Sequence, residues 1–470
     1  VVAGDVDEGD VGMGVGGFCF YGGSAGEGLA ASRSLKAASS TPLLIAADYE
    51  EGLGSRVKGT TELPTNMAIG ASGSEELARR KGGITALEAR AIGVDWVFAP
   101  VLDLAVRPDN PIVNVRSFGA DPVLVSRLGA AFSGGLSDGG ALNSVKHFPG
   151  HGETSVDSHL TMPEVPLARE ALWDADLRPF RDLCRRADSV MVGHLKIKSV
   201  DTAAPASLSR AVITGLLRGE LGYDGPVLTD ALNMKALEGE GEPGVRAFLA
   251  GADVLLYPED PPRLLAALEA AAADGRITDA LVDRALSRQD ALVRRAAAAR
   301  VSPPPFSVVR CAEHLAFPAE AAPRCLAWAW GGGALKPGDA VGYFEPCTAP
   351  SEWKGTAFVK ELSALGLRVQ PYAPGRGMKL AAGLFSRPRA FSGAINLAAA
   401  ESAELRKAVL GAEGSVVAAF GSPFVLDGLS PRPDAALCAF CALEDFQRCA
   451  ARAVSGAVAV FGTMPVKIGG

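Results

Sequence analysis

Three of the chain's five histidines fall within one short stretch, residues 146–159. The stretch follows an apolar run and contains glycine and proline, which are typical of a loop. A loop that only connects two elements needs no such density of titratable side chains, so this one predicts a functional site. Its glycines permit positive φ angles, and we expect the loop to move when a ligand binds.

Asp157 and His159 are the pair in this loop best suited to proton transfer. They lie two positions apart, and in an extended segment such side chains face the same side. The carboxylate can then hold one imidazole nitrogen while the other nitrogen faces a substrate, and its charge favours the protonated ring. The pair therefore predicts an oriented general acid and base. A hydrogen bond that only braces the loop is the alternative.

Asp230 is the candidate nucleophile, because it ends the apolar run 225–230. A carboxylate fixed at the end of a strand is rigid enough to attack a sugar carbon. Other polar side chains at predicted strand ends suit sugar hydroxyls, although a salt bridge accounts equally well for each of them alone. These residues are Asp48, Arg56, Arg116, Lys146 and His194.

The elements that position these residues alternate between strand and helix from residue 15 to residue 258. Seven apolar, β-branched runs, each followed by a helical stretch, occupy residues 15–22, 42–48, 94–103, 141–147, 189–194, 225–230 and 252–258. Their nearly continuous apolar character predicts parallel strands buried on both faces. Since reactive residues end several of the runs, we expect a (β/α)8 barrel of the TIM type. An open doubly wound sheet is the alternative.

The predicted barrel occupies residues 1–300, and its first strand is incomplete, with residues 1–3 as a stub. Three consecutive prolines at 303–305 stop the last helix and mark a linker over 301–309. Residues 310–470 then predict a smaller α/β sandwich domain. Its expected strands are 340–344, 414–420, 435–440 and 457–461.

Composition limits the partners of the chain. A formal net charge of −7 without a basic run argues against nucleic acid and anionic membranes, and no apolar run approaches the ~20 residues of a membrane span. A small neutral or polar substrate fits better, and no metal or cofactor is expected. Eight scattered cysteines suggest reduced thiols and a cytoplasmic location. The chain opens without Met, which leaves a secreted form open, and its oligomeric state is not predicted.

Several motifs together resemble the bacterial β-N-acetylglucosaminidases (β-hexosaminidases) of glycoside hydrolase family 3. Residues 146–159 are similar to that family's KHFPGHG…DSH loop, and residues 227–234 are similar to its nucleophile strand. Further matches in family order are FAPVLD at 98–103, Asn110-Pro111, RSFG at 116–119, DLRPF at 176–180, His194 and PASLS at 205–209. The resemblance covers the whole predicted barrel and, more weakly, the second domain.

This resemblance implies a retaining exo-β-N-acetylglucosaminidase that acts through a covalent glycosyl-enzyme, with muropeptides of the cell wall as its substrates. It assigns Asp230 as nucleophile, His159 as acid/base and Asp157 as its partner. The implied sugar-binding residues are Asp48, Arg56, Arg116, Lys146, His147 and His194. Two positions depart from the family pattern: Glu51 replaces the first glycine of D-x-E-G-G-x-x-x-R, and Glu153 replaces a shorter Asp or Asn.

Other functions remain open at this point. A family 3 β-glucosidase, β-xylosidase or glycoside phosphorylase would share the fold. A metal-dependent hydrolase would instead arrange the loop histidines and nearby carboxylates around zinc; the residues concerned are His147, His151, Asp157, His159, His194 and Asp230. A non-catalytic sugar-binding protein is the third alternative.

Overall fold

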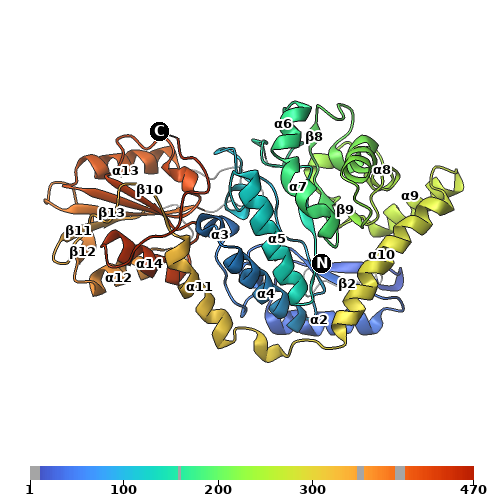
Figure 1. Ribbon diagram of the computed structural model, residues 1–470, viewed down its shortest axis with the longest axis horizontal. Helices are drawn as coiled ribbons and strands as arrows, with labels where there is room; N and C mark the ends of the chain where they lie inside the picture. Colours follow the sequence, from blue (N-terminus) through green and yellow to red (C-terminus); the bar gives the residue numbers. More distant parts are fainter. Residues whose placement is uncertain (1–10, 157–159, 347–353, 387–396, 470) are drawn as a thin grey trace. The chain divides into compact units, whose positions relative to one another are not determined.

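A computed structural model describes residues 11–156, 160–346, 354–386 and 397–469 (Figure 1). The stub at residues 1–3 and the pair Asp157 and His159 lie outside these ranges. The chain forms two compact units. The first comprises Val1–Glu62, Glu75–Leu104 and Val125–Leu315, and the second comprises Leu63–Ser74, Ala105–Leu124 and Ala316–Gly470.

Parallel strands in consecutive order form the first unit. One sheet has the order β1-β2-β3-β4 and another the order β5-β7-β9. A parallel bridge between Val101 and Lys146 joins the two sheets, and a second one places Val254 beside β9. The strands are β1 (Gly17–Phe20), β2 (Leu44–Ala47), β3 (Trp96–Val97), β4 (Leu142–Asn143), β5 (Val145–Phe148), β7 (Val190–Val192) and β9 (Val227–Thr229). Each lies within a predicted run except β5, which ends one residue beyond its run; the run 141–147 is divided into β4 and β5, and the run 252–258 contributes only the bridge at Val254.

Helices follow the strands in this unit, as the alternating pattern predicts. The first of them begins at a capping box, in which Ser24 and Glu27 satisfy each other's backbone N–H groups. The helices are α2 (Ala25–Ala38), α4 (Glu75–Ala91), α5 (Pro122–Asp138), α6 (Arg169–Asp174), α7 (Leu177–Leu183), the π-helix η5 (Ala211–Glu220), α8 (Pro243–Ala250), α9 (Pro261–Ala273) and α10 (Asp279–Arg300). A small parallel pair, β6 (Glu164–Val165) and β8 (Lys196–Ile197), lies apart from the main strands.

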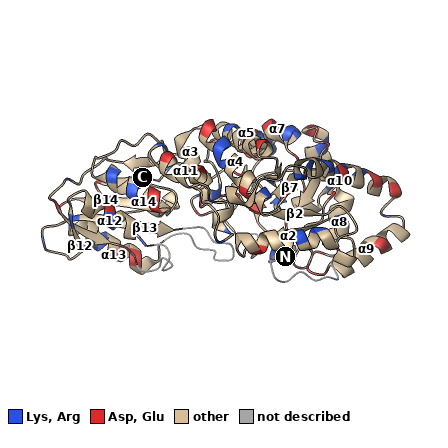
Figure 2. Cartoon of the chain, turned by 90° about the horizontal axis from the view of Figure 1, so that it is seen from below, with Lys and Arg blue, Asp and Glu red and all other residues tan. Residues whose placement is uncertain are grey.

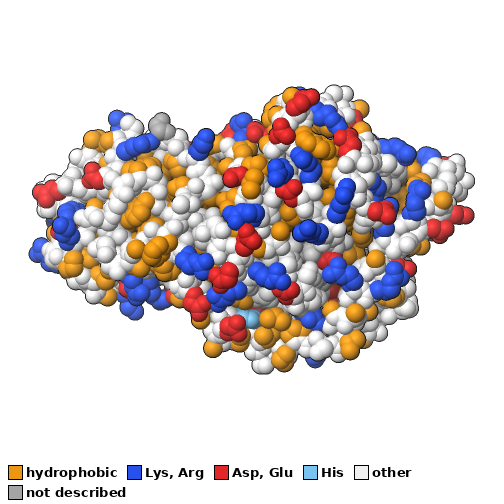
Figure 3. All heavy atoms as spheres, in the orientation of Figure 1, with side chains coloured by type: hydrophobic (Ala, Val, Ile, Leu, Met, Phe, Trp, Pro, Cys, Tyr) orange, Lys and Arg blue, Asp and Glu red, His pale blue; other side chains and the backbone are white. Residues whose placement is uncertain are grey.

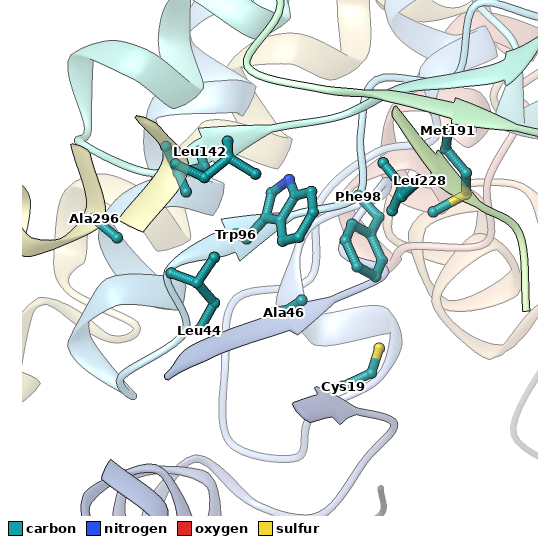
Figure 4. Packing of buried hydrophobic residues seen from close by; sticks show 10 residues of the cluster. Cys19, Leu44, Ala46, Trp96, Phe98, Leu142, Met191, Leu228 and Ala296 are labelled. Carbon is teal, nitrogen blue, oxygen red and sulfur yellow. The ribbon is translucent and has the colours of Figure 1, made fainter. Parts of the chain in front are cut away.

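One hydrophobic cluster receives side chains from six of the seven main strands, all except β5 (Figure 4). Trp96 and Phe98 pack edge to face at its centre, with ring centroids 5.0 Å apart. Helix α10 adds Leu292 and Ala296. The other buried members are Cys19, Leu44, Ala46, Leu142, Met191 and Leu228. The strands therefore share one core on this face.

Three aspartates lie at the amino ends of strands: Asp95 before β3, Asp188 before β7 and Asp253 before Val254. Each carboxylate accepts a backbone N–H from a strand earlier in the chain; the donors are Ile45 (3.0 Å), Asn143 (2.9 Å) and Val227 (2.8 Å). Each also pairs with an arginine of α10; these are Arg300, Arg295 and Arg288. Helix α10 is therefore attached to three strands at their amino ends.

The second unit contains a six-stranded sheet of order β10-β15-β14-β13-β11-β12, in which only β10 is antiparallel. The strands are β10 (Ala327–Trp330), β11 (Ala340–Phe344), β12 (Arg368–Pro371), β13 (Lys379–Ser386), β14 (Ser415–Gly421) and β15 (Ala435–Cys438). The helices are α3 (Asn66–Ser72), α11 (Ala312–Cys325), α12 (Thr356–Ala364), α13 (Ala399–Leu410) and α14 (Glu444–Val454). Both units are α/β, which confirms the predicted class.

Three of the four strands predicted in the C-terminal region are confirmed as β11, β14 and β15. The fourth, at 457–461, is wrong. Helix α14 ends at Val454, Gly456 turns the chain with φ of 74°, and the N–H groups of Ala457 and Val458 return to Arg452 O. These amides complete the helix end instead of joining a sheet. The sequence analysis also did not identify β10, β12 and β13.

Charges of both signs are mixed over the molecule. Figure 2 shows basic and acidic residues together along the helices, and the face drawn in Figure 3 has them side by side. In the ranges that the structure describes, no helix has both the length and the apolar character needed to cross a membrane. The described cysteines are all free thiols.

Candidate active site

The carboxyl ends of the parallel strands bring five of the predicted site residues together. Asp48 follows β2, Lys146 and His147 belong to β5, His194 follows β7 and Asp230 follows β9. Lys146 contacts Asp48 at 2.5 Å, and Lys146, His147 and His194 all act to lower the pKa of Asp230. Consecutive parallel strands end at the same edge, which explains why residues so far apart in sequence share one site.

Asp230 is held by the backbone on both sides. Its N–H donates to Val192 O of β7 at 2.9 Å, and its Oδ1 accepts the N–H of Ala231 at 2.8 Å. Burial acts to raise the pKa of this carboxyl, but His147, His194, the Ala231 amide and Lys146 outweigh it, so the pKa lies below its ordinary value. The group is therefore a carboxylate at neutral pH, which is the form that a nucleophile requires.

His194 is completely buried. Its Nε2 lies 2.9 Å from Ala231 O, a group that only accepts, so Nε2 carries a hydrogen. Its Nδ1 lies 2.7 Å from Ser207 Oγ. Burial lowers the pKa of the ring although Asp230 opposes this, and the neutral ring then accepts the serine hydroxyl at Nδ1. Direct contact with a sugar would require one of these two bonds to break.

Lys146 joins two carboxylates of the segment that follows β2. Its side chain is 2% exposed, and Nζ lies 2.5 Å from Asp48 Oδ1 and 2.5 Å from Glu50 Oε1. A buried ammonium needs such partners, since an unpaired charge there would be strongly unfavourable. Asp48 remains 21% exposed, so its carboxylate is held in place and is still accessible to a ligand.

Asp103 is a site residue that the sequence analysis did not single out. Its carboxylate is completely buried and accepts from His147 Nδ1 at 2.6 Å and from the backbone N–H of His151 at 2.7 Å. Burial acts to raise its pKa, but the interactions with His147 and His151 hold the pKa below its ordinary value. Since Nδ1 is committed to Asp103, any contact of the His147 ring with a sugar comes from Nε2.

His151 continues this network along the loop. Its Nδ1 lies 2.6 Å from Thr154 Oγ1, and the threonine hydroxyl donates to His151 O at 2.9 Å. Burial lowers the pKa of the ring to about 4, although Asp103 acts in the opposite direction. His151 is therefore neutral at physiological pH and braces the described part of the loop.

The two remaining predicted sugar ligands, Arg56 and Arg116, are not among these five residues. Arg56 is exposed and follows the short 3-10 helix η1 (Leu53–Ser55). Arg116 belongs to the second unit, where its guanidinium donates to Ile112 O at 3.2 Å. Glu51, the departure from the glycine pattern, fits because the left-handed residue of this turn is Gly52, with φ of 81°.

This arrangement provides a fixed, ionised carboxylate at Asp230 and a set of polar groups beside it. Asp48 and the Nε2 of His147 can bind hydroxyls, and Lys146 and His194 hold their neighbours in place. In the described part of the chain, no group of three or more His, Cys, Asp or Glu side chains is positioned to hold a metal ion.

Comparison with known proteins gives three findings. Residues 25–291 match the glycosyl hydrolase family 3 N terminal domain. Beta-hexosaminidase A of Pseudoalteromonas piscicida is 34% identical over 248 residues, which cover 48% of this chain and 42% of that protein. The chain spans about half the length of the first such curated relatives.

Solved structures are similar over nearly the whole chain. A glycoside hydrolase family 3 β-N-acetylglucosaminidase from Paenibacillus sp. str. FPU-7 has a TM-score of 0.84 at 30% identity, over 99% of this chain and 96% of that one. The β-glucoside phosphorylase BglX has a TM-score of 0.89 at 22% identity, over 98% and 91%. At that identity the second likeness concerns the fold alone.

Proposed function

Because this chain belongs to glycosyl hydrolase family 3, we propose that it is a retaining exo-β-N-acetylglucosaminidase that removes terminal β-linked N-acetylglucosamine. The observation that carries the proposal is Asp230, a carboxylate kept ionised and fixed by the backbone at the edge where His147, His194 and Lys146 meet. A rigid, deprotonated carboxylate beside hydrogen-bonding groups is what covalent glycosidase chemistry requires.

The proposed scaffold is a (β/α)8 barrel over residues 1–300, with a linker at 301–309 and an α/β sandwich domain at 310–470. Three observations support the barrel: the strands are parallel and consecutive, six of the seven share one core cluster, and the aromatic residues after β1 and after the bridge at Val254 meet. The rings of Tyr21 and Tyr257 pack edge to face with centroids 5.7 Å apart. Closure of a sheet would bring these two ends together.

In the first step, an oxygen of Asp230 attacks the anomeric carbon while the bond from this carbon to the leaving oxygen breaks. His159, oriented by Asp157, donates its proton to that oxygen, and an ester between sugar and Asp230 results. In the second step His159 takes a proton from water, whose oxygen attacks the same carbon and releases Asp230. Two inversions retain the configuration.

The remaining residues bind and orient. Asp48, His147 and Arg56 contact sugar hydroxyls in this proposal, and Lys146 sets the position of Asp48. His194 acts through Ala231 on the segment that carries Asp230, because both of its nitrogens bond to protein groups.

The acetamido sugar is proposed from the names of the relatives, a β-hexosaminidase and a β-N-acetylglucosaminidase, and from the loop at 146–159. Muropeptides are the proposed natural source, with water as the acceptor.

A screen of aryl β-glycosides tests this function. We expect turnover of the N-acetylglucosaminide in preference to the glucoside and xyloside. NMR should show that the first product has the β configuration. An α-configured first product would contradict retention, and preference for the glucoside would contradict the substrate. Added phosphate should leave the product unchanged, and formation of a sugar phosphate would identify a phosphorylase.

A further inference from the structure

Asp176 is a buried carboxyl with no role in the steps above. It is 1% exposed and is the residue immediately before α7. An aspartate at this position commonly accepts an N–H from the first turn of its helix, but this side chain makes no such bond. Its carboxyl instead faces the loop that follows His147.

The loop rests directly on this carboxyl. A methyl group in place of the Gly150 hydrogen would lie 2.6 Å from Asp176 Cβ and 2.9 Å from its Oδ1, and one at Gly152 would lie 3.2 Å from the same oxygen. Gly150 also has a φ of 129°. The two glycines therefore allow the turn to approach the aspartate more closely than any other residues could.

The carboxyl shares this space with other acidic groups. The charges of Glu153, in the loop, and of Asp103, after β3, both act on Asp176. Asp103 has to be ionised, because it accepts hydrogen bonds from His147 and His151. His151 is neutral and supplies no compensating charge. Two neighbouring buried carboxyls cannot both ionise without a large cost.

We propose that Asp176 is a positioning residue whose protonated carboxyl supports the turn at residues 150–153 and, through Asp103, the catalytic-site imidazole of His147. Ionisation of Asp176 places a second negative charge beside Asp103 and Glu153 and weakens that support. Activity therefore falls as Asp176 loses its proton. This inference rests on the proposed function.

The pKa of Asp176 is consistent with these contacts. Burial, then Glu153, then Asp103 raise the pKa of Asp176 to about 7, and the backbone amides of Asp176 and Gly152 oppose this without outweighing it. The transition consequently falls within the range in which a glycosidase can be assayed.

The test measures kcat/KM against pH with a dinitrophenyl N-acetylglucosaminide, whose acidic phenol leaves without protonation. Asp176→Asn preserves the shape of the protonated group, so it should keep activity within about 3-fold at pH 6 and move the alkaline limb up by about one unit or more. Glu153→Gln should move the same limb down, because Asp176 then ionises more easily. Asp182→Asn, on the exposed side of the same helix, is the matched control and should change neither.

Unfolding by urea gives a readout independent of catalysis. The folded chain keeps the proton up to about pH 7, and the unfolded chain releases it near 3.8, so ionisation of Asp176 costs stability as pH rises between these values. Asp176→Asn should match the parent at pH 4 and exceed it progressively towards pH 7. The proposal would be overturned if the alkaline limb of kcat/KM stayed in place in both Asp176→Asn and Glu153→Gln. A difference in stability between Asp176→Asn and the parent that does not change with pH would also overturn it. If the parent chain turns over no aryl glycoside, the proposed function fails and the stability comparison decides on the Asp176 support.

Discussion

Environment gives three carboxyls in and around the site different protonation states. Asp230 and Asp103 are surrounded by imidazoles and backbone amides, which hold their pKa values low. Asp176 is surrounded by other acids, and its pKa rises to about 7. Pairs of titratable groups whose surroundings separate their pKa values are typical of catalytic sites. At the residue scale, two of these carboxyls are therefore suited to accept bonds or attack, and one is suited to keep its proton.

Asp230 is predicted to form the covalent bond to the sugar. Asp230→Ala should remove essentially all turnover, because no other group replaces the nucleophile. A fluorinated substrate should label this residue in the parent chain, as mass spectrometry of the digested protein would show. Labelling of Asp103 or Asp48 instead would refute the assignment.

His159 is predicted to protonate the leaving group. Protonation matters most for poor leaving groups, so His159→Ala should slow natural disaccharides by about 10²–10⁴-fold and spare the glycosylation step for acidic phenols. Azide, which needs no general base, should accelerate breakdown of the trapped intermediate. Asp157→Asn should give a milder form of this behaviour.

The Asp103 and His147 pair provides the matched control for that experiment. His147→Ala should slow good and poor leaving groups to a similar degree, because a hydroxyl-binding group acts on both. If His147→Ala, and not His159→Ala, slows poor leaving groups more than good ones, His147 with its partner Asp103 is the acid/base.

At the scale of elements, helix α10 connects strands that are distant in sequence. Its arginines pair with Asp95, Asp188 and Asp253, and Leu292 enters the shared core. The backbone amides that these aspartates accept belong to neighbouring strands. The helix therefore helps to hold the amino ends of these strands in place.

Leu292→Ala should destabilise the chain by about 2–4 kcal/mol, because it removes a buried side chain from the core cluster. Leu286→Ala, on the same helix but 52% exposed, should cost less than about 0.5 kcal/mol. Urea unfolding of both variants measures the difference. Equal losses would mean that α10 contributes no specific packing.

Glu88 of α4 connects two segments that are separated in sequence. It accepts from Thr61 N at 2.9 Å, Arg310 N at 2.9 Å and His314 Nδ1 at 2.9 Å. Burial acts to raise its pKa, but these bonds and the Thr61 hydroxyl hold the pKa below its ordinary value.

Folding therefore favours the ionised form of Glu88, and its contribution to stability is complete above the unfolded pKa near 4.5 and is lost as pH falls through the lower folded value. The stability advantage of the parent over Glu88→Gln should shrink below that pH. Glu76→Gln, at an exposed position of the same helix, should show little pH dependence. A constant difference for Glu88→Gln from pH 7 to pH 3 would contradict this prediction.

At the scale of the whole molecule, Asp230 and the described sugar-binding candidates other than Arg116 lie in the first unit. The C-terminal part of the second unit, from residue 316, is predicted to supply no catalytic group. Glu345 there accepts from Tyr343 Oη at 2.6 Å and Gly355 N at 2.8 Å, and Asp427 accepts from Gly469 N at 2.6 Å. These hydrogen bonds give both carboxylates a structural role.

Alanine at Glu345 or Asp427 should accordingly leave kcat near the parent value while lowering the unfolding temperature. Steady-state kinetics and thermal unfolding of each variant separate the two effects. A loss of about 100-fold in kcat, equivalent to about 2.7 kcal/mol, in a folded variant would place catalytic chemistry in this unit.

The sequence by itself determined the α/β class, the order of the strands in the first unit and the polar residues at their ends. Strand runs and end residues are local features, so periodicity and the motifs at 98–103 and 146–159 were sufficient to identify them. The same motifs led to the family that the comparisons confirm.

Only the tertiary structure decided which residues act on one another. Asp103 reaches His147 across 44 positions, and Asp176 meets the turn at Gly150 through a contact that no local pattern encodes. Burial and neighbouring charges determine the pKa values of these groups, and both depend on the packed state. The same reason explains the misassigned strand at 457–461: an apolar segment forms a strand only where a neighbouring strand is available to pair with it.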